Sequence, residues 1–460
     1  MIKLFRHHVS FGSLVMLGAD AALLLLVIPL AVVMRGSDWQ TLESMLPAAV
    51  FTALMLGLNA SLGLYRREGA AGFGVHLGRV LLAVVIGTPV AYMLFSVTPH
   101  GYEARGAIGY AVVLTLCGLI LLRQVVFWAS HAGLGAKRVL IIGTGNDAAG
   151  VERALGTLGY PSLSIVGFYP AGLAGEAPAV AADRILPATL PLPEVVRGLG
   201  VKEVIVAVRE QRGGVLPLRE LIDCRVSGVP VTDVAGMYER IRGEVPLESL
   251  KASWLIYGQG FAQGGVRTFV KRAFDITVSA ALLIVTLPLM LLAALAVRLE
   301  SPGPVIYRQE RVGRGGRVFT CLKFRSMRAD AEGDGVERWC RAGDPRVTRV
   351  GNFIRKTRID ELPQLINVLR GEMSFVGPRP ERPGFVEDLK RDIPYYDLRH
   401  SVKPGITGWA QVRYSYGASV EDARKKLQFD LYYVKNHSLF LDLLILVETV
   451  RVVLFREGAR

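Results

Sequence analysis

Four long apolar segments near the N-terminus constrain the fold of this 460-residue chain more than any other feature of its sequence. They cover residues 11–33, 45–65, 80–97 and 107–128. Each reaches or approaches the roughly twenty residues that a helix needs to cross the hydrocarbon of a bilayer. A cleaved signal peptide is a poor fit, because three further segments follow the first. The first segment contains Asp20, whose charge is costly in lipid, so we expect it to face other helices or lie near a helix end.

Basic residues are distributed unequally between the loops that would join these segments. With a cytoplasmic N-terminus, one side of the membrane would receive Lys3, Arg6, Arg66, Arg67, Arg79, Lys137 and Arg138. The other side would receive mainly Arg35 and Arg105. Lys and Arg are enriched in cytoplasmic loops, so this asymmetry places the N-terminus and everything after about residue 130 in the cytoplasm. We therefore expect a multi-pass protein of the cell inner (cytoplasmic) membrane.

Composition narrows the class of protein further. Hydrophobic residues make up 51% of the chain and charged residues only 20%, which fits neither a disordered chain nor an ordinary soluble enzyme. The formal net charge of +14 favours an anionic partner such as nucleic acid, a membrane surface or a phosphorylated substrate. The four cysteines are far apart and form no C-x-x-C pair. That spacing argues against a disulfide framework, a zinc ribbon and an iron–sulfur site.

Residues 134–265 have the pattern of a cytoplasmic Rossmann-like α/β domain. Residues 137–148 are typical of a buried parallel strand, a glycine turn and the start of a helix, and β-branched apolar runs follow at 201–208 and 228–234. The turn with Gly143 and Gly145 could place backbone N–H groups on a phosphate. Two glycines after a strand are also common in helix–strand packing without a ligand, so both interpretations stay open.

A further uncharged segment covers residues 276–297. It is long enough to cross the bilayer, but basic residues flank both of its ends, so both ends prefer the cytoplasmic face. Pro288 lies in the middle, where it removes a backbone hydrogen bond and favours a kink. We therefore favour a re-entrant membrane helix over residues 271–299, broken at Pro288, over a complete span.

The chain after this segment is strongly basic. Between residues 308 and 328 there are seven Lys or Arg residues and one acid, Glu310. Such a patch can face anionic lipid headgroups, or some of its charges can hold the phosphates of a substrate. Both interpretations can hold together. Alternation of apolar and polar residues at 301–313 and 322–327 predicts short strands here.

An acidic pair follows at Asp360 and Glu361. Apolar residues at 362, 365, 366 and 369 predict an amphipathic helix that begins at about Asp360 and ends at Gly371. By itself, the pair could simply cap this helix at the positive end of its dipole. The nearby cations Arg355, Lys356 and Arg358 would also keep a carboxylate ionised at neutral pH. An ionised carboxylate beside a magnesium ion is a competent nucleophile toward phosphorus.

Two prolines bracket one arginine at Pro378, Arg379 and Pro380. They fix the backbone on both sides of the guanidinium, which can then grip a phosphate with two parallel hydrogen bonds at little entropic cost. Alone, such a loop is weak evidence for a phosphate-binding site. Downstream of an acidic pair, it is stronger evidence for one.

With these motifs in order, residues from about 270 to 460 resemble the bacterial sugar transferase family, the monotopic polyprenyl-phosphate hexose-1-phosphate transferases. Besides Pro288, the matching segments are KRAFD (271–275), KFRSM (323–327), DELPQL (360–365), MSFVGPRP (373–380) and KPGITGWAQV (403–412). The four apolar segments and the α/β domain resemble the long form of the family. The segments RYSYGAS (413–419) and DLYY (430–433) resemble its exosortase-associated exopolysaccharide subgroup.

The resemblance implies three domains: a four-helix transmembrane bundle at 1–133, the α/β domain at 134–265, and a monotopic α/β catalytic domain at 268–460 on the cytoplasmic face. It implies transfer of a hexose-1-phosphate from a UDP-sugar to undecaprenyl phosphate, with release of UMP, as the first step of exopolysaccharide biosynthesis. By position, Asp360 would form a phosphosugar intermediate, and Asp360 and Glu361 would hold Mg²⁺. Arg379, between Pro378 and Pro380, would grip phosphate, with Lys323 and Arg355 nearby.

One departure from the family concerns the helix break. Small members often carry serine just before the proline, whereas this chain has Leu287, and Thr286 could supply the hydroxyl one position earlier. The last apolar segment, 440–455, with Asp442, Glu448 and Arg451, fits either an interfacial helix or ordinary core packing.

Other functions fit the sequence less well. A tethered nucleotide-sugar dehydratase or epimerase needs a tyrosine with a lysine four residues later, and the sequence has no such pair. A non-enzymatic scaffold would require Asp360 and Glu361 to be only a helix cap. A nucleic-acid binder is disfavoured, because no aromatic residues for base stacking are interleaved with the basic ones. The lipid bilayer is thus an expected partner and nucleic acid is not; the transferred sugar and the oligomeric state stay open, a homodimer being one option.

Overall fold

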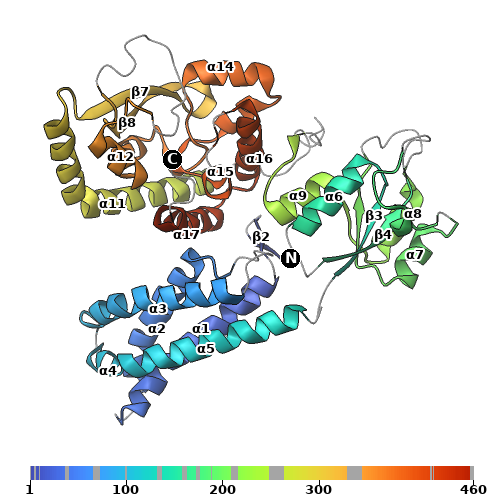
Figure 1. Cartoon of the computed structure of the whole chain (residues 1–460), viewed down its shortest axis with the longest axis horizontal. Helices are drawn as coiled ribbons and strands as arrows, with labels where there is room; N and C mark the ends of the chain where they lie inside the picture. Colours follow the sequence, from blue (N-terminus) through green and yellow to red (C-terminus); the bar gives the residue numbers. More distant parts are fainter. Residues whose placement is uncertain are drawn as a thin grey trace. The chain divides into compact units, whose positions relative to one another are not determined.

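The computed structural model describes residues 2–4, 7–9, 11–36, 41–65, 73–98, 101–131, 137–157, 163–171, 177–187, 189–208, 216–247, 264–328, 344–414, 417 and 419–455. It divides the chain into two compact units (Figure 1). One unit is built mainly from Val9–Ile241, and the other from Arg242–Arg460 together with Lys3–His8. A short two-stranded sheet of β1 (Ile2–Leu4) and β2 (His7–Val9) precedes the first helix.

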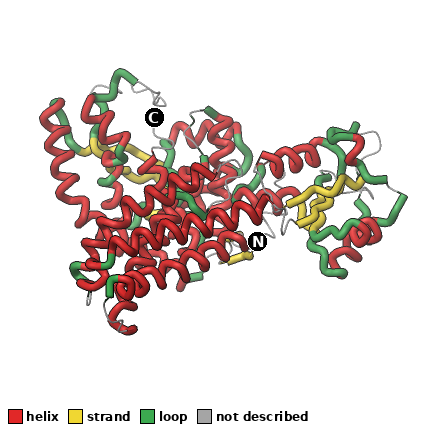
Figure 2. The backbone as a smooth tube through the Cα atoms, turned by 60° about the horizontal axis from the view of Figure 1, so that its bottom comes forward, coloured by secondary structure: helices red, strands yellow, loops and turns green. Residues whose placement is uncertain are grey.

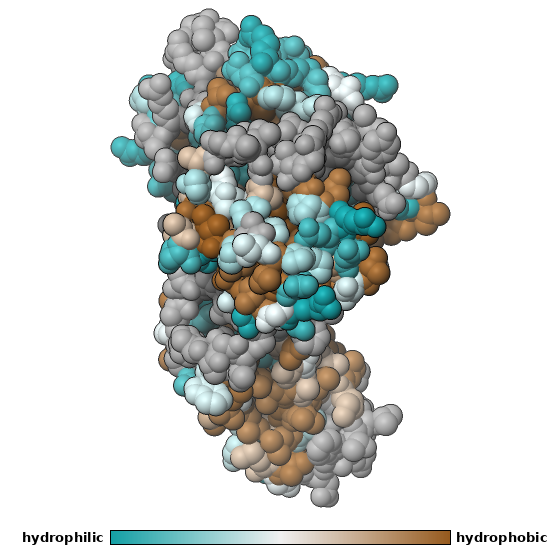
Figure 3. All heavy atoms as spheres, turned by 90° about the vertical axis from the view of Figure 1, so that its right-hand side faces the viewer, coloured by the Kyte–Doolittle hydropathy of each residue, from teal (hydrophilic) through white to brown (hydrophobic). Residues whose placement is uncertain are grey.

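The first unit begins with a helical bundle, as predicted. Its long helices are α1 (Phe11–Met34), α2 (Thr41–Ser61), α3 (Phe73–Phe95) and α5 (Ile108–His131). A short helix, α4 (Gly101–Gly106), was not predicted. By length and composition α1, α3 and α5 can each cross a membrane, and α2 contains the shorter apolar stretch Met45–Ser61. Apolar atoms cover much of the bundle surface at the bottom of Figure 3, as expected for helices in lipid.

Asp20 faces the interior of this bundle, which confirms the expectation from its cost in lipid. Its side chain is fully buried and forms a two-pronged ion pair with Arg123, with N–O distances of 3.0 and 2.6 Å. The Tyr65 hydroxyl donates a third hydrogen bond, at 2.8 Å. The charge of α1 is therefore neutralised within the bundle by a residue of α5.

A four-stranded parallel sheet follows, in the order β4-β3-β5-β6. Its strands are β3 (Lys137–Ile142), β4 (Leu163–Tyr169), β5 (Glu203–Val206) and β6 (Val231–Asp233). Its helices are α6 (Asn146–Thr157), α7 (Leu192–Gly198), α8 (Leu218–Val226) and α9 (Val234–Arg242). Alternate residues of β3 point to opposite faces: Leu140 and Ile142 pack with α7 and α8, whereas Val139 and Ile141 pack with α6 and α9. The sheet is thus covered on both faces, which explains the continuous apolar run in β3 (Figure 2).

The glycine turn after β3 has a structural reason. Gly143 has a positive φ of 110°, and a Cβ atom there would lie 2.6 Å from the carbonyl oxygen of Ala207. Only glycine fits this close approach to the chain after β5. The observation supports the packing interpretation of Gly143, while phosphate binding at this turn stays untested.

The longest helix of the second unit is α11 (Gly265–Glu300), with 36 residues. Pro288 lies inside the helix, and Figure 1 shows α11 changing direction sharply along its length. Near the first end, Arg272 donates hydrogen bonds to the carbonyl oxygens of Val368 and Leu369. Near the second end, Arg325 donates to those of Val297 and Ser301. Both ends of α11 are therefore held by the same folded unit, although a straight helix of this length would separate them by about 54 Å.

The remaining elements of this unit surround a common core. An antiparallel hairpin of β7 (Ile306–Val312) and β8 (Val318–Phe324) confirms that the basic segment forms strands. The second strand begins and ends earlier than the expected 322–327. A parallel pair is formed by β9 (Ser374–Val376) and β10 (Gly405–Thr407). The helices are α12 (Arg349–Lys356), α13 (Gln364–Arg370), α14 (Pro383–Asp392), α15 (Trp409–Arg413), α16 (Val420–Asn436) and α17 (Leu439–Phe455).

The last helix, α17, packs into this core. Leu441 and Ile445 are fully buried, and the three charged residues singled out in the sequence are buried as well. Asp442 pairs with Lys271 at 3.0 Å, and Glu448 pairs with Arg413 at 3.0 Å. Of the two interpretations of this segment, core packing is the one that the contacts support.

Candidate active site

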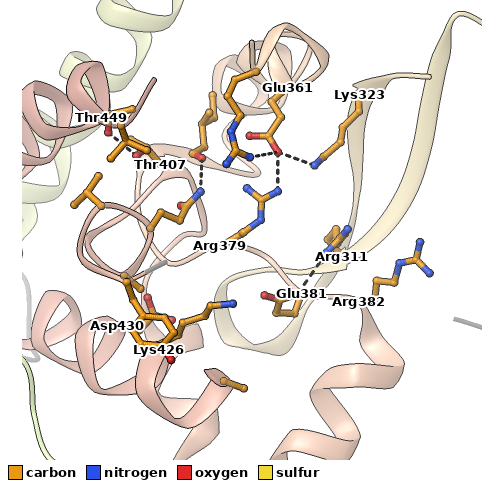
Figure 4. A pocket seen from close by; sticks show the side chains of 18 of the residues that line it. Arg311, Lys323, Glu361, Arg379, Glu381, Arg382, Thr407, Lys426, Asp430 and Thr449 are labelled. Atoms are coloured by element: carbon orange, nitrogen blue, oxygen red, sulfur yellow. Dashed lines mark hydrogen bonds and ion pairs between the residues drawn. The ribbon is translucent and has the colours of Figure 1, made fainter. Parts of the chain in front are cut away.

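Three segments that are far apart in the sequence meet around one cavity of about 420 Å³ in the second unit. Lys323 comes from β8, Arg355 from the end of α12, and Arg379 from the loop after β9. Glu361 lines the same cavity from a short 3-10 turn over Ile359–Glu361. Figure 4 shows the side chains of Glu361, Lys323 and Arg379 pointing toward one another. The structure therefore brings four of the predicted site residues to one cavity. Asp360 precedes Glu361 in the same turn but is not among the residues that line the cavity.

Glu361 is the centre of a dense ion-pair cluster. Its Oε1 atom lies 2.6 Å from Nη2 of Arg379, 3.0 Å from Nζ of Lys323 and 4.0 Å from Nη1 of Arg358. Burial alone would raise the pKa of this carboxyl group, but these cations outweigh burial and hold the pKa well below its usual range. Glu361 is consequently a permanent negative charge that fixes the positions of three cationic side chains.

Asp360 has very different surroundings. Its side chain is buried, and its Oδ1 atom has no hydrogen-bond partner among the described residues. Burial and the negative charge of Glu361 raise the pKa of Asp360 to about 6, against the opposing effects of Lys323, Arg355 and Arg358. The sequence interpretation anticipated the stabilising cations but not the effect of burial. Asp360 is still mainly ionised at pH 7, and it holds one oxygen free for a new contact.

The expected start of the helix at Asp360 is wrong. Ile359–Glu361 form a 3-10 turn, and α13 begins only at Gln364, with Pro363 as its N-cap residue. The turn is entered through Arg358, which has a left-handed backbone with φ of 60°. The stop at Gly371 is confirmed, because Gly371 is the left-handed C-cap with φ of 87°. The carboxylates therefore belong to a tight turn before the helix rather than to its first turn.

Pro378 and Pro380 are buried on either side of the half-buried Arg379. The backbone of this loop is held by two arginines that the sequence interpretation did not assign to the site. Arg399 donates from Nη2 to the carbonyl oxygen of Arg379 at 2.8 Å, and Arg311 donates from Nη1 to that of Pro380 at 2.9 Å. These contacts join positions 20 and 69 residues apart, so no local pattern could have revealed them.

Two of the sequence motifs meet backbone to backbone beneath this loop. Gly377 N–H donates to the carbonyl oxygen of Thr407 at 2.9 Å, and Gly405 N–H donates to that of Pro378 at 2.9 Å. A Cβ atom on Gly377 would lie 2.3 Å from the carbonyl oxygen of Lys403, and one on Gly408 would lie 2.2 Å from that of Gly377. The glycines of both motifs are therefore needed for the close approach of the two segments.

The first motif, KRAFD, anchors the membrane helix to the same loop. Asp275 of α11 accepts hydrogen bonds from the Ser374 hydroxyl at 3.1 Å and the Phe375 N–H at 3.2 Å, and it pairs with Lys271 at 2.9 Å. Ser374 and Phe375 belong to β9, which leads directly into the loop of Arg379. Pro288 lies further along α11 and does not line the cavity.

The residues present fit a magnesium ion only together with a substrate. Within the described part of the chain, no group of three or more His, Cys, Asp or Glu side chains could hold a metal. Mg²⁺ usually uses one or two carboxylates plus substrate phosphates and water. Asp360 offers a buried, unpartnered oxygen. Four cationic side chains, those of Lys323, Arg355, Arg358 and Arg379, act on Asp360 and Glu361. The anionic phosphates would therefore have to accompany the metal.

Comparisons with known proteins agree with this geometry. Residues 266–456 match the family model described as "Bacterial sugar transferase". A protein of Xanthomonas campestris pv. campestris, named UDP-glucose:undecaprenyl-phosphate glucose-1-phosphate transferase, is 33% identical over 380 residues, which are 77% of this chain and 75% of that protein. The chain belongs to the bacterial sugar transferase family.

Other relatives of this sugar transferase match shorter stretches. The UDP-N-acetylgalactosamine-undecaprenyl-phosphate N-acetylgalactosaminephosphotransferase of Aeromonas hydrophila is 45% identical over 242 residues, 53% of this chain and 56% of that protein. The chain thus spans only about half of that relative's length. The exopolysaccharide production protein PSS of Rhizobium leguminosarum bv. phaseoli is 44% identical over 190 residues, 39% of this chain and 93% of that protein.

Proposed function

We propose that this protein transfers a sugar-1-phosphate from a UDP-sugar to undecaprenyl phosphate and releases UMP, as the first step of exopolysaccharide biosynthesis. The observation that carries the proposal is the pairing of an unpartnered, buried carboxylate oxygen on Asp360 with a cluster of cations that Glu361 holds in place. The names of the relatives support the substrate classes, and they include more than one sugar. The sugar is therefore left unassigned.

In the first step, an Asp360 carboxylate oxygen attacks the β-phosphorus, which carries the sugar. A P–O bond forms to Asp360, and the bond from the β-phosphorus to the bridging oxygen breaks. UMP leaves with that oxygen, and the sugar-phosphate stays on Asp360. Lys323, Arg355 and Arg379 are positioned to neutralise the charge that develops on the phosphate oxygens.

In the second step, a phosphate oxygen of undecaprenyl phosphate attacks the same phosphorus. The P–O bond to Asp360 breaks, the carboxylate is regenerated, and a lipid-linked diphosphate sugar is formed. Both steps exchange one P–O bond for another, so no oxidant or additional reactant is required. What the protein must supply is positioning and charge neutralisation.

We also propose Mg²⁺ as a cofactor, held by Asp360, Glu361 and the substrate diphosphate. Bound there, magnesium would supply charge neutralisation on the diphosphate. The role of Arg379 is to hold a phosphate oxygen, and the roles of Pro378 and Pro380 are to keep its backbone rigid. Lys323 would contact both Glu361 and the substrate phosphate.

The proposed site lies at the headgroup level of the cytoplasmic leaflet. The support is that both ends of α11 are bonded to the catalytic unit, which favours a helix that enters and leaves the membrane on one side. Thr286 donates to the Leu282 carbonyl oxygen at 2.7 Å, four residues earlier in α11. Its hydroxyl is therefore bonded within α11, two residues before Pro288.

The experiment uses membranes that contain the full chain, supplied with UDP-sugars and undecaprenyl phosphate. We expect UMP and a lipid-linked diphosphate sugar as products, in a reaction that a chelator abolishes. Asp360→Asn should lower the rate by at least about a thousandfold, because the nucleophile is lost while the shape is kept. The matched control Asp388→Asn removes a carboxylate of α14 whose side chain is 63% exposed, and it should retain activity. Release of UDP in place of UMP would contradict the proposal.

A further inference from the structure

Apolar side chains line the catalytic cavity in addition to its charged ones, and we call five of them its apolar arm. They are Leu282 of α11, Leu362 directly after the 3-10 turn, Leu365 of α13, Ile406 of β10 and Val452 of α17. None of these side chains can donate or accept a hydrogen bond. The cavity therefore combines a cluster of charges, suited to phosphates, with a surface suited to a hydrocarbon.

Two threonine hydroxyl groups also line this cavity. Figure 4 shows Thr407 and Thr449 side by side. Their hydroxyl oxygens lie 2.7 Å apart, and Thr449 Oγ1 also donates to the carbonyl oxygen of Ile445 at 2.7 Å. Both hydroxyl hydrogens are thus donated within the protein, so neither threonine has a donor left for a sugar hydroxyl.

The apolar arm reaches the outer surface of the membrane helix. Leu282 lines the cavity and is also exposed, and its neighbours Ile284 and Val285 are 74% and 75% exposed. These side chains belong to the apolar helix that is long enough to enter a bilayer. A hydrocarbon chain could therefore pass from lipid, over Leu282, into the cavity that Glu361 lines.

We propose that this arm binds the isoprenyl units next to the phosphate of the lipid acceptor. The inference rests on the proposed function and adds where the acceptor lies and which residues recognise it. A UDP-sugar is polar along its whole length apart from the faces of its rings, so it does not need an apolar arm that opens toward lipid. An isoprenyl chain does, because leaving it in water costs about 0.8 kcal/mol per CH₂ group.

The test separates the two half-reactions in the purified full-length protein. The donor step is followed as UMP release in a single turnover without acceptor, and the acceptor step as transfer to undecaprenyl phosphate or farnesyl phosphate. Leu282→Trp should raise the acceptor KM about tenfold, the factor that a loss of about 1.4 kcal/mol produces. Its effect on UMP release should be at least about fivefold smaller. Both acceptors should be affected alike, because both carry the proximal isoprenyl units.

Two further variants keep the test decisive. Leu292→Trp is the matched control, because Leu292 lies on the same helix, is 65% exposed and does not line the cavity; it should change neither step by more than about twofold. Leu282→Ala removes contact without adding bulk and should raise the acceptor KM about threefold.

Equal slowing of UMP release in Leu282→Trp would assign the arm to the donor. Unchanged acceptor kinetics in both Leu282 variants would also overturn the inference. Absence of UMP release in the parent protein would instead overturn the proposed function.

Discussion

Asp360 and Glu361 are adjacent, yet their surroundings push their pKa values in opposite directions. Glu361 pairs with three cations, whereas one oxygen of Asp360 has no hydrogen-bond partner in the part of the chain that the structure describes. Paired carboxyl groups with separated pKa values commonly have separate roles. The contacts indicate which carboxylate has which role. Glu361 is ion-paired and positions the cations, whereas Asp360 is left to react. The sequence predicted both residues but not this difference, because the difference comes from burial and from residues distant in the chain.

At the same scale, the geometry of Arg379 can be tested with its charge kept. Arg379→Lys retains a cation beside Glu361 but removes the planar fork that grips phosphate with two hydrogen bonds. We expect kcat/KM for the UDP-sugar to fall by about tenfold to a hundredfold, measured as the initial rate of UMP release. Arg391→Lys, at a side chain that is 75% exposed on α14, is the control and should behave like the parent. Equal rates for Arg379→Lys and the parent would show that charge alone suffices.

His400 provides a test of how the protein's stability depends on pH, at a residue other than Asp360 and Glu361. Burial, followed by the charge of Arg399, lowers the pKa of His400 to about 4. The unfolded chain binds this proton with an ordinary pKa of about 6.5, so the folded state loses stability as pH falls from 6.5 toward 4. At pH 4.5 the loss is on the order of 2 kcal/mol.

His400→Gln, which stays neutral at every pH, should remove this dependence. The measurement is the Tm of the detergent-solubilised protein at pH 7 and pH 5. We expect a smaller decrease in Tm between these values for His400→Gln than for the parent. Identical decreases would mean that His400 is not buried in its neutral form.

At the scale of elements, the structure could be predicted where one local pattern dominates. The length of the apolar segments predicted the helices of the bundle, and the alternation of apolar and polar residues predicted strands where the β7–β8 hairpin lies. Strand β4 was missed, because Gly167 and Ser164 interrupt its apolar pattern and it becomes a strand by pairing with β3. The start of α13 was misplaced, because the 3-10 turn over Ile359–Glu361 reflects tertiary contacts of Glu361 rather than propensity.

The anchoring of α11 to β9 also belongs to this scale. Asp275→Ala removes a buried carboxylate that accepts hydrogen bonds from Ser374 and Phe375. We expect unfolding to become easier by about 3 kcal/mol, because these donors and the ammonium of Lys271 lose a buried partner. Activity should fall as well, because β9 leads into the Arg379 loop.

Thermal unfolding and UMP release in the same preparation measure both effects. Glu387→Ala is the control, because this side chain is 73% exposed, and its free energy of unfolding should stay within about 0.5 kcal/mol of the parent's. An unchanged Tm in Asp275→Ala would show that the anchor contributes nothing to the fold.

At the scale of the whole molecule, the sequence predicted which residues form the site but not how they are held. Lys323, Glu361 and Arg379 were proposed from their motifs, and the structure brings them within bonding distance. Of the supporting arginines, Arg311 lies in the basic segment but was not distinguished from the other cations there, and Arg399 lies in a segment without a diagnostic pattern. Their role depends on the folded positions of the loop carbonyl groups, which one sequence does not contain.

The proposed topology of the chain can be tested at this scale. If α11 enters and leaves the membrane on one side, residues before and after it lie in the same compartment. In a variant lacking the native cysteines, single cysteines at the exposed positions Arg225 and Arg391 should both resist an impermeant maleimide in intact cells. Both should react after permeabilisation. Labelling of the Arg391→Cys protein alone in intact cells would indicate that α11 spans the bilayer.

The central claim is that the Asp360 carboxylate forms a covalent bond to the phosphorus of the transferred group. The most direct measurement incubates the purified protein with UDP-sugar labelled in its β-phosphate, without lipid acceptor, and identifies the labelled residue by mass spectrometry. We expect label on Asp360, loss of that label when undecaprenyl phosphate is added, and no label in Asp360→Asn, while Asp388→Asn is labelled like the parent. Product formation by the parent without any label on Asp360 would contradict the account.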